Sequence, residues 1–469
     1  MNHNIILAVD SYKISMNKQY VPGTEFVYSY VESRGGKWPN TLVFGLQAFL
    51  KEYLCKPITQ DNIDEATEFY IAHGEPFNRD GWQYILDRHK GYLPVLIKII
   101  DEGSFIPVHN VLATIMNTDP ECFWLTTHIE TSLLRALWFG TTVATNSFMC
   151  KVAILKALNL SSDDPLGQLP FKLHDFSARG VSSAETAALG GCAHLVNFMG
   201  TDTVEGVLAA RQYYAEPIAG FSIPAAEHST MTSFGRKHEV DAYRNMLTQF
   251  AKPGSMVAVV SDSYDLMNAV SNIWGDVLKQ EVNDSGATVI IRPDSGDPLI
   301  VPVKVIGALS EKFGYTINSK GYKVLPSCVR VIQGDGIDAD SLPIILDNIL
   351  AAGFSADNIA FGMGGGLGQK IDRDTLKFAM KCSAARVNGV WRDVFKDPVT
   401  DPGKRSKKGR LALRLNNGQF TTMRKEDLNP DEDLLRYVFH NGKLLIDHKF
   451  SDIRQRANQA AIMMANILK

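Results

Sequence analysis

Residues 290–297 read IIRPDSGD, residues 331–336 read VIQGDG, and residues 360–368 read AFGMGGGLG. In each stretch a short apolar run passes directly into a loop that carries glycine or charge, and a helical pattern follows. The same unit recurs between about residues 172 and 370, with further runs that end at residues 174–176, 197–200, 221–223 and 259–261. The spacing is that of a strand, a loop and a helix, which predicts repeated βα units.

Helix signals follow these runs at the expected places. Ser182-Ser183-Ala184-Glu185 combines a serine cap with an acidic residue in the first turn. Asp340-Ser341-Leu342-Pro343 places a proline in a first turn, where it is tolerated. Repeated βα units imply parallel strands, and seven of them are nearly enough to close a barrel. We therefore predict an α/β domain over residues 151–379, either a barrel or an open doubly wound sheet.

The two ends of the chain have a different pattern. Residues 1–150 mix strand-like stretches such as 26–31 with helical stretches such as 63–72. From about residue 380 the chain has strand-turn-strand character, and a helix is expected from Asp452 to Leu468. We predict that residues 1–150 and 380–469 together form one additional α+β domain.

Composition excludes several classes of protein. The net charge of -3 over 469 residues argues against non-specific electrostatic binding to nucleic acid or anionic lipid. The longest early apolar run, residues 5–9, is too short for a signal-peptide core or a membrane span. The six cysteines are scattered without a CxxC pair, as in proteins of a reducing compartment. We expect a cytoplasmic protein that binds neither nucleic acid nor membrane.

Ionisable or glycine-rich sequence follows almost every predicted strand. In a parallel α/β barrel these strand ends converge on a single mouth. A surface charge or a helix cap would explain one such residue well. It would not explain why ionisable or glycine-rich sequence follows most strands of the repeat. The predicted mouth holds a cluster of glycines and Asp175, Arg179, Asp202, Glu227, His228, Asp262, Arg292, Asp294 and Asp335.

The glycine loop at residues 362–368 follows a strand and precedes Arg373. Glycines let the backbone approach an anion, and their N–H groups can cradle a phosphate. The loop is neither a Walker A loop nor a dinucleotide fingerprint. We predict that it binds the phosphate of a sugar, with Arg373 as a bidentate partner, although a tight turn without a ligand would give the same pattern.

Four residues of this mouth suggest polar chemistry. Asp294 and Asp335 could accept hydrogen bonds from vicinal ribose hydroxyls or hold Mg²⁺ through water. Arg292 offers a fork of donors, although a structural pair with Asp294 is the alternative. His228 could bind pyrophosphate or accept a phosphoryl group transiently. The basic run at residues 404–410 is interpreted as a solvated loop, with a contribution to polyphosphate binding as the second possibility.

Taken together, these segments resemble the nicotinamide phosphoribosyltransferase family, to which nicotinate phosphoribosyltransferases are related. The resemblance runs from about residue 8 to the C-terminal helix and rests on residues 10–13, 174–183, 200–203, 224–230, 261–265, 291–296, 331–336 and the glycine loop. It implies a type II phosphoribosyltransferase fold: an irregular α/β barrel plus a second α+β domain built from both chain ends. It also implies a homodimer with active sites at the interface.

The resemblance implies roles for individual residues. The nicotinamide ring would lie between Phe176 and Tyr12 of the other subunit, with its carboxamide on Asp202. Diphosphate contacts would fall on Arg179, His228 and Arg292. The other implied substrate contacts are Asp262, Asp294, Gly334, Asp335, Gly364, Gly365 and Arg373. We regard His228, Arg292 and Asp294 as catalytic and assign no residue as a direct metal ligand.

The predicted reaction joins nicotinamide to phosphoribosyl pyrophosphate, giving nicotinamide mononucleotide and diphosphate in NAD salvage, with Mg²⁺ and facultative ATP as cofactors. ATP would act through phosphorylation of His228, as the resemblance implies. Asp202 favours nicotinamide, because a carboxylate accepts the amide N–H but repels the carboxylate of nicotinate. A nicotinate phosphoribosyltransferase and a non-catalytic nucleotide-binding protein are the alternatives. A barrel aldolase is disfavoured, since no lysine occupies a predicted strand end.

Overall fold

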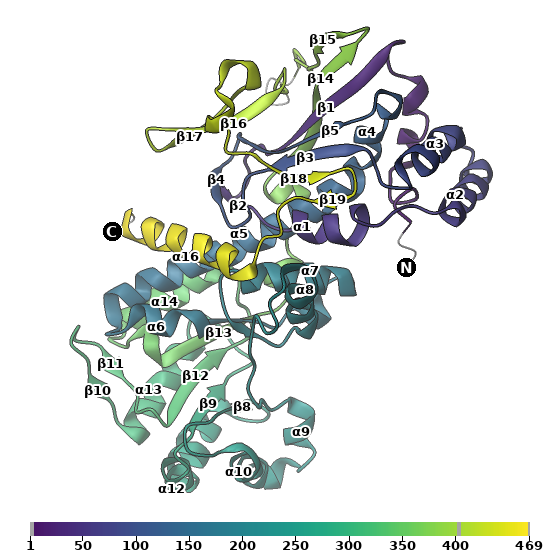
Figure 1. Cartoon of the computed structure of the whole chain (residues 1–469). Coiled ribbons are helices and arrows are strands. Elements are labelled where there is room, and N and C mark those ends of the chain that lie inside the picture. The colour runs from purple at the N-terminus through teal and green to yellow at the C-terminus, as the bar shows by residue number, and fades with distance from the viewer. Residues whose placement is uncertain (1–3, 401–404, 468–469) are drawn as a thin grey trace. The chain divides into compact units, whose positions relative to one another are not determined.

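A computed structural model describes residues 4–400 and 405–467. The chain forms two compact units (Figure 1). The terminal unit comprises the residues up to Thr145 together with Gln212–Glu216 and Asp372–Ala457. The barrel unit comprises Asn146–Arg211, Pro217–Ile371 and the residues from Asn458 onward.

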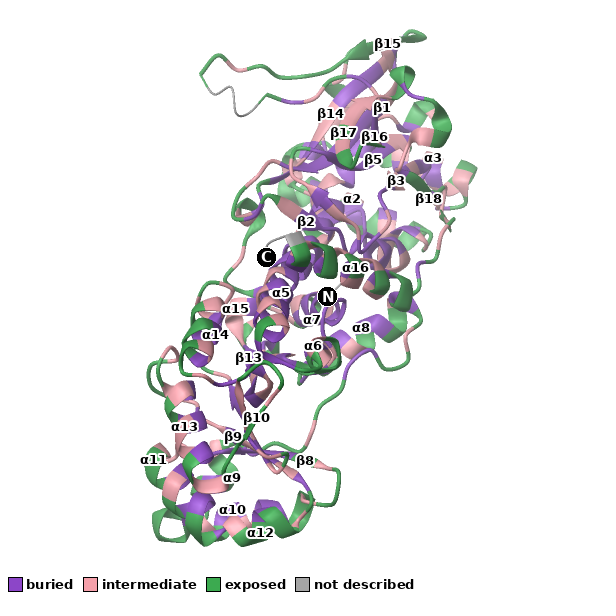
Figure 2. Cartoon of the chain, turned by 90° about the vertical axis from the view of Figure 1, so that its left-hand side faces the viewer, coloured by how far each residue is buried: buried purple, intermediate pink, exposed green. Residues whose placement is uncertain are grey.

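The terminal unit is built on a seven-stranded antiparallel sheet in the order β15-β14-β1-β5-β3-β18-β19. Its strands are β1 (Thr24–Ser33), β3 (Val95–Ile99), β5 (Val111–Asn117), β14 (Phe378–Val387), β15 (Val390–Asp393), β18 (Arg436–His440) and β19 (Lys443–Leu444). Strands from the C-terminal part flank the N-terminal strands on both sides, so both chain ends share one sheet. The central strands β1 and β5 are largely buried (Figure 2).

Local sequence explains the turns of this unit. Asn388 and Gly389 join β14 to β15 with φ values of 50° and 77°, the double left-handed turn that Asn-Gly pairs favour in hairpins. Asn417 and Gly418 join β16 (Leu411–Asn416) to β17 (Gln419–Arg424) in the same way.

Helices and a short strand pair complete the terminal unit. Thr59 and Asn62 form a capping box at the start of α2 (Gln60–His73), which ends at Gly74 in the left-handed conformation. The unit also contains α1 (Leu46–Phe49), α3 (Arg79–His89), α4 (Leu125–His128), β2 (Asn40–Leu42) and β4 (Phe105–Pro107). The two longest helices among the described residues, α5 (Glu130–Ser161) and α16 (Phe450–Ile467), have residues in both units. The predicted C-terminal helix is therefore confirmed, except that Leu468 lies outside the described residues.

The barrel unit contains a parallel sheet in the order β7-β6-β13-β12-β9-β8. Its strands are β6 (Leu173–Asp175), β7 (Gly200–Thr201), β8 (Met256–Val260), β9 (Thr288–Arg292), β12 (Val329–Gln333) and β13 (Ile359–Met363). Residues 257–260 of β8 are buried without alternation, as expected for a parallel strand covered on both faces. Each strand coincides with one of the apolar runs in the sequence.

The seventh apolar run closes this sheet into an irregular barrel. Phe221 bridges to Gly200 on the β7 edge, and Ala225 bridges to Ala258 on the β8 edge, both in parallel. The N–H of Phe221 donates to Met199 O at 2.7 Å, and the N–H of Ala258 donates to Pro224 O at 2.9 Å. The barrel is thus confirmed and an open sheet excluded. The seventh run, which ends at residues 221–223, forms single bridges in place of a regular strand, since Pro224 cannot donate to a ladder.

Helices follow the strands as the βα pattern predicts. Ser183 caps α7 (Ala184–Leu195) in a capping box with Thr186, and α14 begins at Ser341. The other helices are α6 (Pro165–Gln168), α8 (Val204–Tyr214), α9 (His228–Thr232), α10 (Glu239–Phe250), α11 (Leu266–Asn268), α12 (Lys279–Asp284), α13 (Val301–Phe313), α14 (Ser341–Ala351) and α15 (Gly365–Gly368), and a hairpin of β10 (Thr316–Ile317) and β11 (Lys323–Val324) follows α13.

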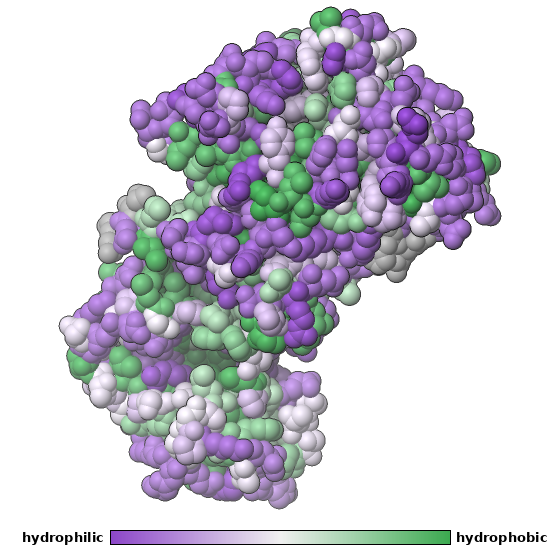
Figure 3. All heavy atoms as spheres, in the orientation of Figure 1, coloured by the Kyte–Doolittle hydropathy of each residue, from purple (hydrophilic) through white to green (hydrophobic). Residues whose placement is uncertain are grey.

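The face drawn in Figure 3 is mainly hydrophilic, with apolar residues exposed in separate patches. Such patches are ordinary on globular proteins, because polar groups are too few to cover the whole surface. Within residues 4–400 and 405–467, every helix is too short or too polar to span a bilayer.

Candidate active site

The carboxyl ends of the barrel strands bring most of the predicted residues to one mouth. Phe176 and Arg179 follow β6, Asp202 follows β7, and Asp262 follows β8. Arg292 ends β9 and Asp294 comes two residues later. Gly334 and Asp335 follow β12, Gly364 and Gly365 follow β13, and His228 begins α9 after the closing segment.

A hydrogen-bonded chain orients His228. Its Nε2 lies 2.9 Å from Asp262 Oδ1, and Ser295 Oγ donates to Asp262 Oδ2 at 2.5 Å. The Asp262 side chain is only 4% exposed, whereas that of His228 is 42% exposed. Because a carboxylate only accepts, Nε2 carries the proton and the lone pair of neutral His228 stays on Nδ1. The site therefore presents an accessible imidazole nitrogen, Nδ1, at 3.9 Å from Asp294 Oδ2.

Arg292 has donor capacity left over. Its contact with Asp294 is long, at 3.5 Å, and its Nε is buried without a hydrogen-bond partner within the described part of the chain. An unpaired buried donor is costly, so such a group is usually satisfied by a bound partner. The arrangement favours an anion at this position more than a purely structural Arg–Asp pair.

Asp202 is held by a residue that the sequence reasoning did not assign. Ser222 Oγ donates to Asp202 Oδ1 at 2.5 Å, and the N–H of Asp202 donates to Asp175 O at 2.9 Å. Asp202 is exposed, which leaves its Oδ2 free to accept from a ligand. Burial lowers the pKa of nearby His174, so this imidazole is neutral at pH 7.

The glycine loop and the loop after β6 lie side by side. A Cβ built on Gly180 would stand 3.5 Å from the backbone nitrogen of Gly365, which begins α15. The first N–H groups of a helix have no acceptor within the helix, so those at the start of α15 can donate to a ligand. Arg179 is adjacent to Gly180 and lies in the same loop after β6. The pairing is suited to a phosphate group that is held by backbone and guanidinium donors.

Two predicted residues belong to the terminal unit. Tyr12 lies in the short turn Ser11–Lys13 and is 63% exposed, and Arg373 lies in the turn Arg373–Thr375, 3.3 Å from Asp374. Their roles in substrate binding stay predictions. In the basic run, Lys404 lies outside the described residues. The ion-paired members of that run are Arg405 with Asp397, Lys407 with Glu32, and Arg410 with Glu426.

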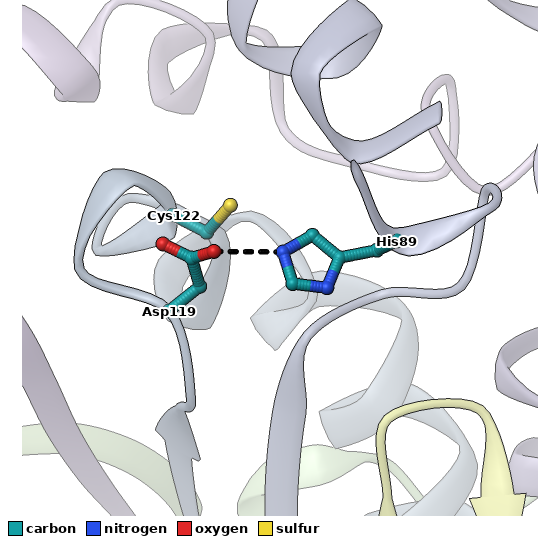
Figure 4. A group of neighbouring side chains, drawn as sticks. All are labelled: His89, Asp119 and Cys122. Carbon is teal, nitrogen blue, oxygen red and sulfur yellow. Dashed lines mark hydrogen bonds and ion pairs between the residues drawn. The ribbon is translucent and has the colours of Figure 1, made fainter. Parts of the chain in front are cut away.

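The terminal unit also contains a group of potential metal ligands, His89, Asp119 and Cys122 (Figure 4). His89 Nε2 lies 2.8 Å from Asp119 Oδ2, and Asp119 Oδ1 accepts from the N–H of Glu121 at 2.9 Å. Burial raises the pKa of the Cys122 thiol to about 12, so the thiol is protonated when no metal ion is bound. We interpret the group as a hydrogen-bonded link between the end of α3 and the turn at residues 120–122.

The guanidinium, carboxylate and backbone donors and acceptors gathered at this barrel mouth are suited to a phosphorylated sugar. Residues 171–443 match the nicotinate phosphoribosyltransferase (NAPRTase) family, and residues 4–97 match the N-terminal domain of nicotinamide phosphoribosyltransferase. The chain is 54% identical to a nicotinamide phosphoribosyltransferase of Xanthomonas campestris pv. campestris, covering 98% of this chain and 99% of the relative. A second nicotinamide phosphoribosyltransferase, from Acinetobacter baylyi, is 35% identical and is covered over 97% of both chains.

Solved structures agree on the fold. The nicotinate-nucleotide pyrophosphorylase of Pyrococcus furiosus superposes with a TM-score of 0.65 at 17% identity, over 99% of this chain and 97% of that one. Human nicotinic acid phosphoribosyltransferase gives 0.62 at 15% identity, over 97% and 94%. The chain belongs to the nicotinate phosphoribosyltransferase family and, within it, to the nicotinamide phosphoribosyltransferases, as the motifs indicated. It is therefore a pentosyltransferase.

Proposed function

We propose that the chain transfers the phosphoribosyl group of phosphoribosyl pyrophosphate to nicotinamide, giving nicotinamide mononucleotide and diphosphate for NAD salvage. The observation that carries this proposal is Asp202, which is anchored by Ser222 through one oxygen and exposes the other at the barrel mouth. The names of the relatives at 54% and 35% identity support the same substrate. The six cysteines all lie in the described residues and form no disulfide there, which fits a reducing compartment such as the cytoplasm.

The reaction needs no protein nucleophile. The pyridine nitrogen of nicotinamide forms a bond to the anomeric carbon while the bond to the pyrophosphate oxygen breaks, through an oxocarbenium-like transition state. Arg179 and Arg292 bind the departing diphosphate and stabilise its developing charge. Asp294 and Asp335 hold the ribose hydroxyls in place. Catalysis comes chiefly from positioning and electrostatics.

The residues at the mouth fit a magnesium ion. Within the described residues, the charged partners of Asp294 are Arg292, at the long distance of 3.5 Å, and His228, at 3.9 Å. Asp335 is exposed, so both carboxylates are open to a hydrated cation. When bound, Mg²⁺ supplies positive charge that stabilises the diphosphate.

The test is product formation from phosphoribosyl pyrophosphate and Mg²⁺ with either nicotinamide or nicotinate, each with and without ATP. Nicotinamide mononucleotide identified by mass supports the proposal. Product only from nicotinate makes the chain a nicotinate phosphoribosyltransferase and overturns the role of Asp202. Absence of product from both would favour a non-catalytic nucleotide-binding protein.

We further propose that ATP phosphorylates His228. The Nδ1 lone pair would take the γ-phosphoryl group: the Pγ–O bond of ATP breaks, the N–P bond forms, and ADP leaves. The buried Asp262, fixed by Ser295, holds the opposite nitrogen and stabilises the charge on the ring.

Replacing His228 with alanine is expected to abolish both the labelling of the protein by γ-³²P-ATP and any acceleration of mononucleotide synthesis by ATP. His238→Ala is the matched control, since His238 is exposed and its ion-pair partner in the described part of the chain is Asp241 of α10. Labelling of the His228→Ala protein at the wild-type level would contradict the assignment.

We also propose a homodimer in which Tyr12 completes the site of the partner subunit. The residues on either side of Tyr12 are anchored to the start of α5: Lys13, 5% exposed, pairs with Glu130 at 2.5 Å, and Asp10 accepts from Thr131 Oγ1 at 2.6 Å. This anchoring presents a fixed, 63% exposed aromatic ring to solvent.

Subunit complementation tests this arrangement. Tyr12→Ala and Arg292→Ala are each expected to be strongly impaired, but a mixed dimer has one site with both residues intact. Co-refolded mixtures should therefore regain about a quarter of wild-type activity, because half the dimers are mixed and each has one competent site. A mixture no more active than the sum of the separate variants would show that Tyr12 does not serve a partner's site.

A further inference from the structure

The ring of Phe176 reaches across three neighbouring strands. Phe176 follows β6, and its N–H donates to Met363 O of β13 at 3.0 Å. Gly362 of β13 pairs with His174 of β6, and Phe361 pairs with Gln333 of β12. Gly362 and Gly334 therefore stand side by side, one residue beyond the last pair, and the ring lies against both.

The contact with Gly362 leaves no room for a side chain. A Cβ built there would stand 2.0 Å from Cε2, 2.2 Å from Cδ2 and 2.8 Å from Cζ of Phe176. Carbon atoms that are not bonded prefer separations of about 3.5 to 4.0 Å. At Gly334 the corresponding distance is 3.3 Å, and Asp294 Oδ1 lies 3.6 Å away, so the ring ends close to the predicted ribose site.

Backbone conformation does not explain the glycine at position 362. Its φ lies outside the left-handed region, where a side chain would be strained, and its three nearest neighbours are all atoms of the Phe176 ring. Within the described residues, the one aromatic neighbour of Phe176 is His174, with ring centroids 6.2 Å apart and tilted by 48°. Phe176 is only half-buried, so part of its ring remains available to a ligand.

We infer that Gly362 is a positioning residue for the nicotinamide ring, which acts by seating Phe176. The missing side chain lets the Phe176 ring lie over β13, between Asp202 at the end of β7 and Asp294 after β9. A pyridine ring stacked there would direct its carboxamide toward Asp202 and its nitrogen toward the sugar. This inference deepens the proposed function and rests on it.

Gly362→Ala is expected to raise the KM for nicotinamide by about 10- to 100-fold, because a methyl group displaces the ring by an ångström or more. The KM for phosphoribosyl pyrophosphate should change by less than about twofold, since the phosphate donors are untouched. In a Phe176→Ala background the same substitution should cost less than about twofold, because the clashing ring is gone. Gly307→Ala in α13 is the control: a Cβ at Gly307 has nothing within 4 Å.

The kinetic outcomes decide the inference when the enzyme turns over nicotinamide. A split between the two KM values, lost in the Phe176→Ala background, supports it. Equal effects of Gly362→Ala in both backgrounds, or behaviour like that of Gly307→Ala, would overturn it. If Gly362→Ala is insoluble, recovery of soluble protein in the Phe176→Ala/Gly362→Ala double variant supports the inference, because it shows that the added methyl group clashes with the Phe176 ring. An insoluble double variant beside a soluble Phe176→Ala overturns it.

A crystal structure of Gly362→Ala separates this inference from the proposed function. If the wild type does not use nicotinamide, the proposed function fails. A displaced Phe176 ring would still support the inference that Gly362 positions this ring. If the Phe176 ring has not moved in the crystal structure of the variant, Gly362 does not position that ring, whatever the enzyme's activity.

Discussion

Arg292→Ala is expected to lower kcat/KM for phosphoribosyl pyrophosphate by about 100- to 1,000-fold, the range found when one preorganised donor to a developing negative charge is removed. The expectation follows from the unpaired, buried Nε of Arg292 and its long 3.5 Å contact with Asp294. Because the guanidinium is little used by the protein itself, its donors remain available to the departing diphosphate.

Steady-state kinetics with saturating nicotinamide measure this effect. Arg292→Lys should recover only part of the loss, since an ammonium keeps the charge but not the planar fork. Arg244→Ala is the matched control, because Arg244 of α10 pairs with Asp241 of the same helix and with Glu281 of α12, away from the strand ends. A loss below about fivefold in Arg292→Ala would mean that Arg292 is a structural partner of Asp294 and not a substrate ligand.

The second large effect concerns the selectivity between the two substrates, or bases, nicotinamide and nicotinate. Asp202→Ser should narrow the preference for nicotinamide over nicotinate by about 100-fold, because two juxtaposed carboxylates repel each other by several kcal/mol. The wild-type Asp202 cannot easily turn away, since Ser222 holds one of its oxygens at 2.5 Å.

The ratio of kcat/KM for the two bases, measured in wild type and variant, checks this prediction. Asp202→Asn is the matched variant: it keeps the size and the hydrogen-bonding capacity but removes the charge, and it should relax selectivity similarly. If selectivity stays unchanged in both variants, Asp202 does not discriminate between the bases, and another feature of the mouth must do so.

Much of the fold could be predicted because its signals are local. Apolar runs that end in charge, the Ser183 cap and the turns at Asn388-Gly389 and Asn417-Gly418 each depend on a few consecutive residues. Barrel closure depends on single bridges at Phe221 and Ala225, and no local pattern distinguishes those from an open edge.

In the site, too, some residues could be predicted from local sequence and others could not. Residues directly after strands, such as Arg292 and Asp262, could be found from their position along the chain. The hydrogen bonds of Ser222 and Ser295 to carboxylates could not, since they depend on how side chains from different loops are directed. Gly362 resembled any other glycine of its loop until the Phe176 ring was located against it.

One competition experiment tests the central claim most directly. The wild-type protein is given phosphoribosyl pyrophosphate, Mg²⁺ and equal concentrations of nicotinamide and nicotinate, and the two mononucleotides are quantified at early times. Their ratio equals the ratio of kcat/KM for the two bases. We predict an excess of nicotinamide mononucleotide of about 100-fold, as expected if the Asp202 carboxylate excludes nicotinate. A mixture dominated by nicotinate mononucleotide would contradict the account.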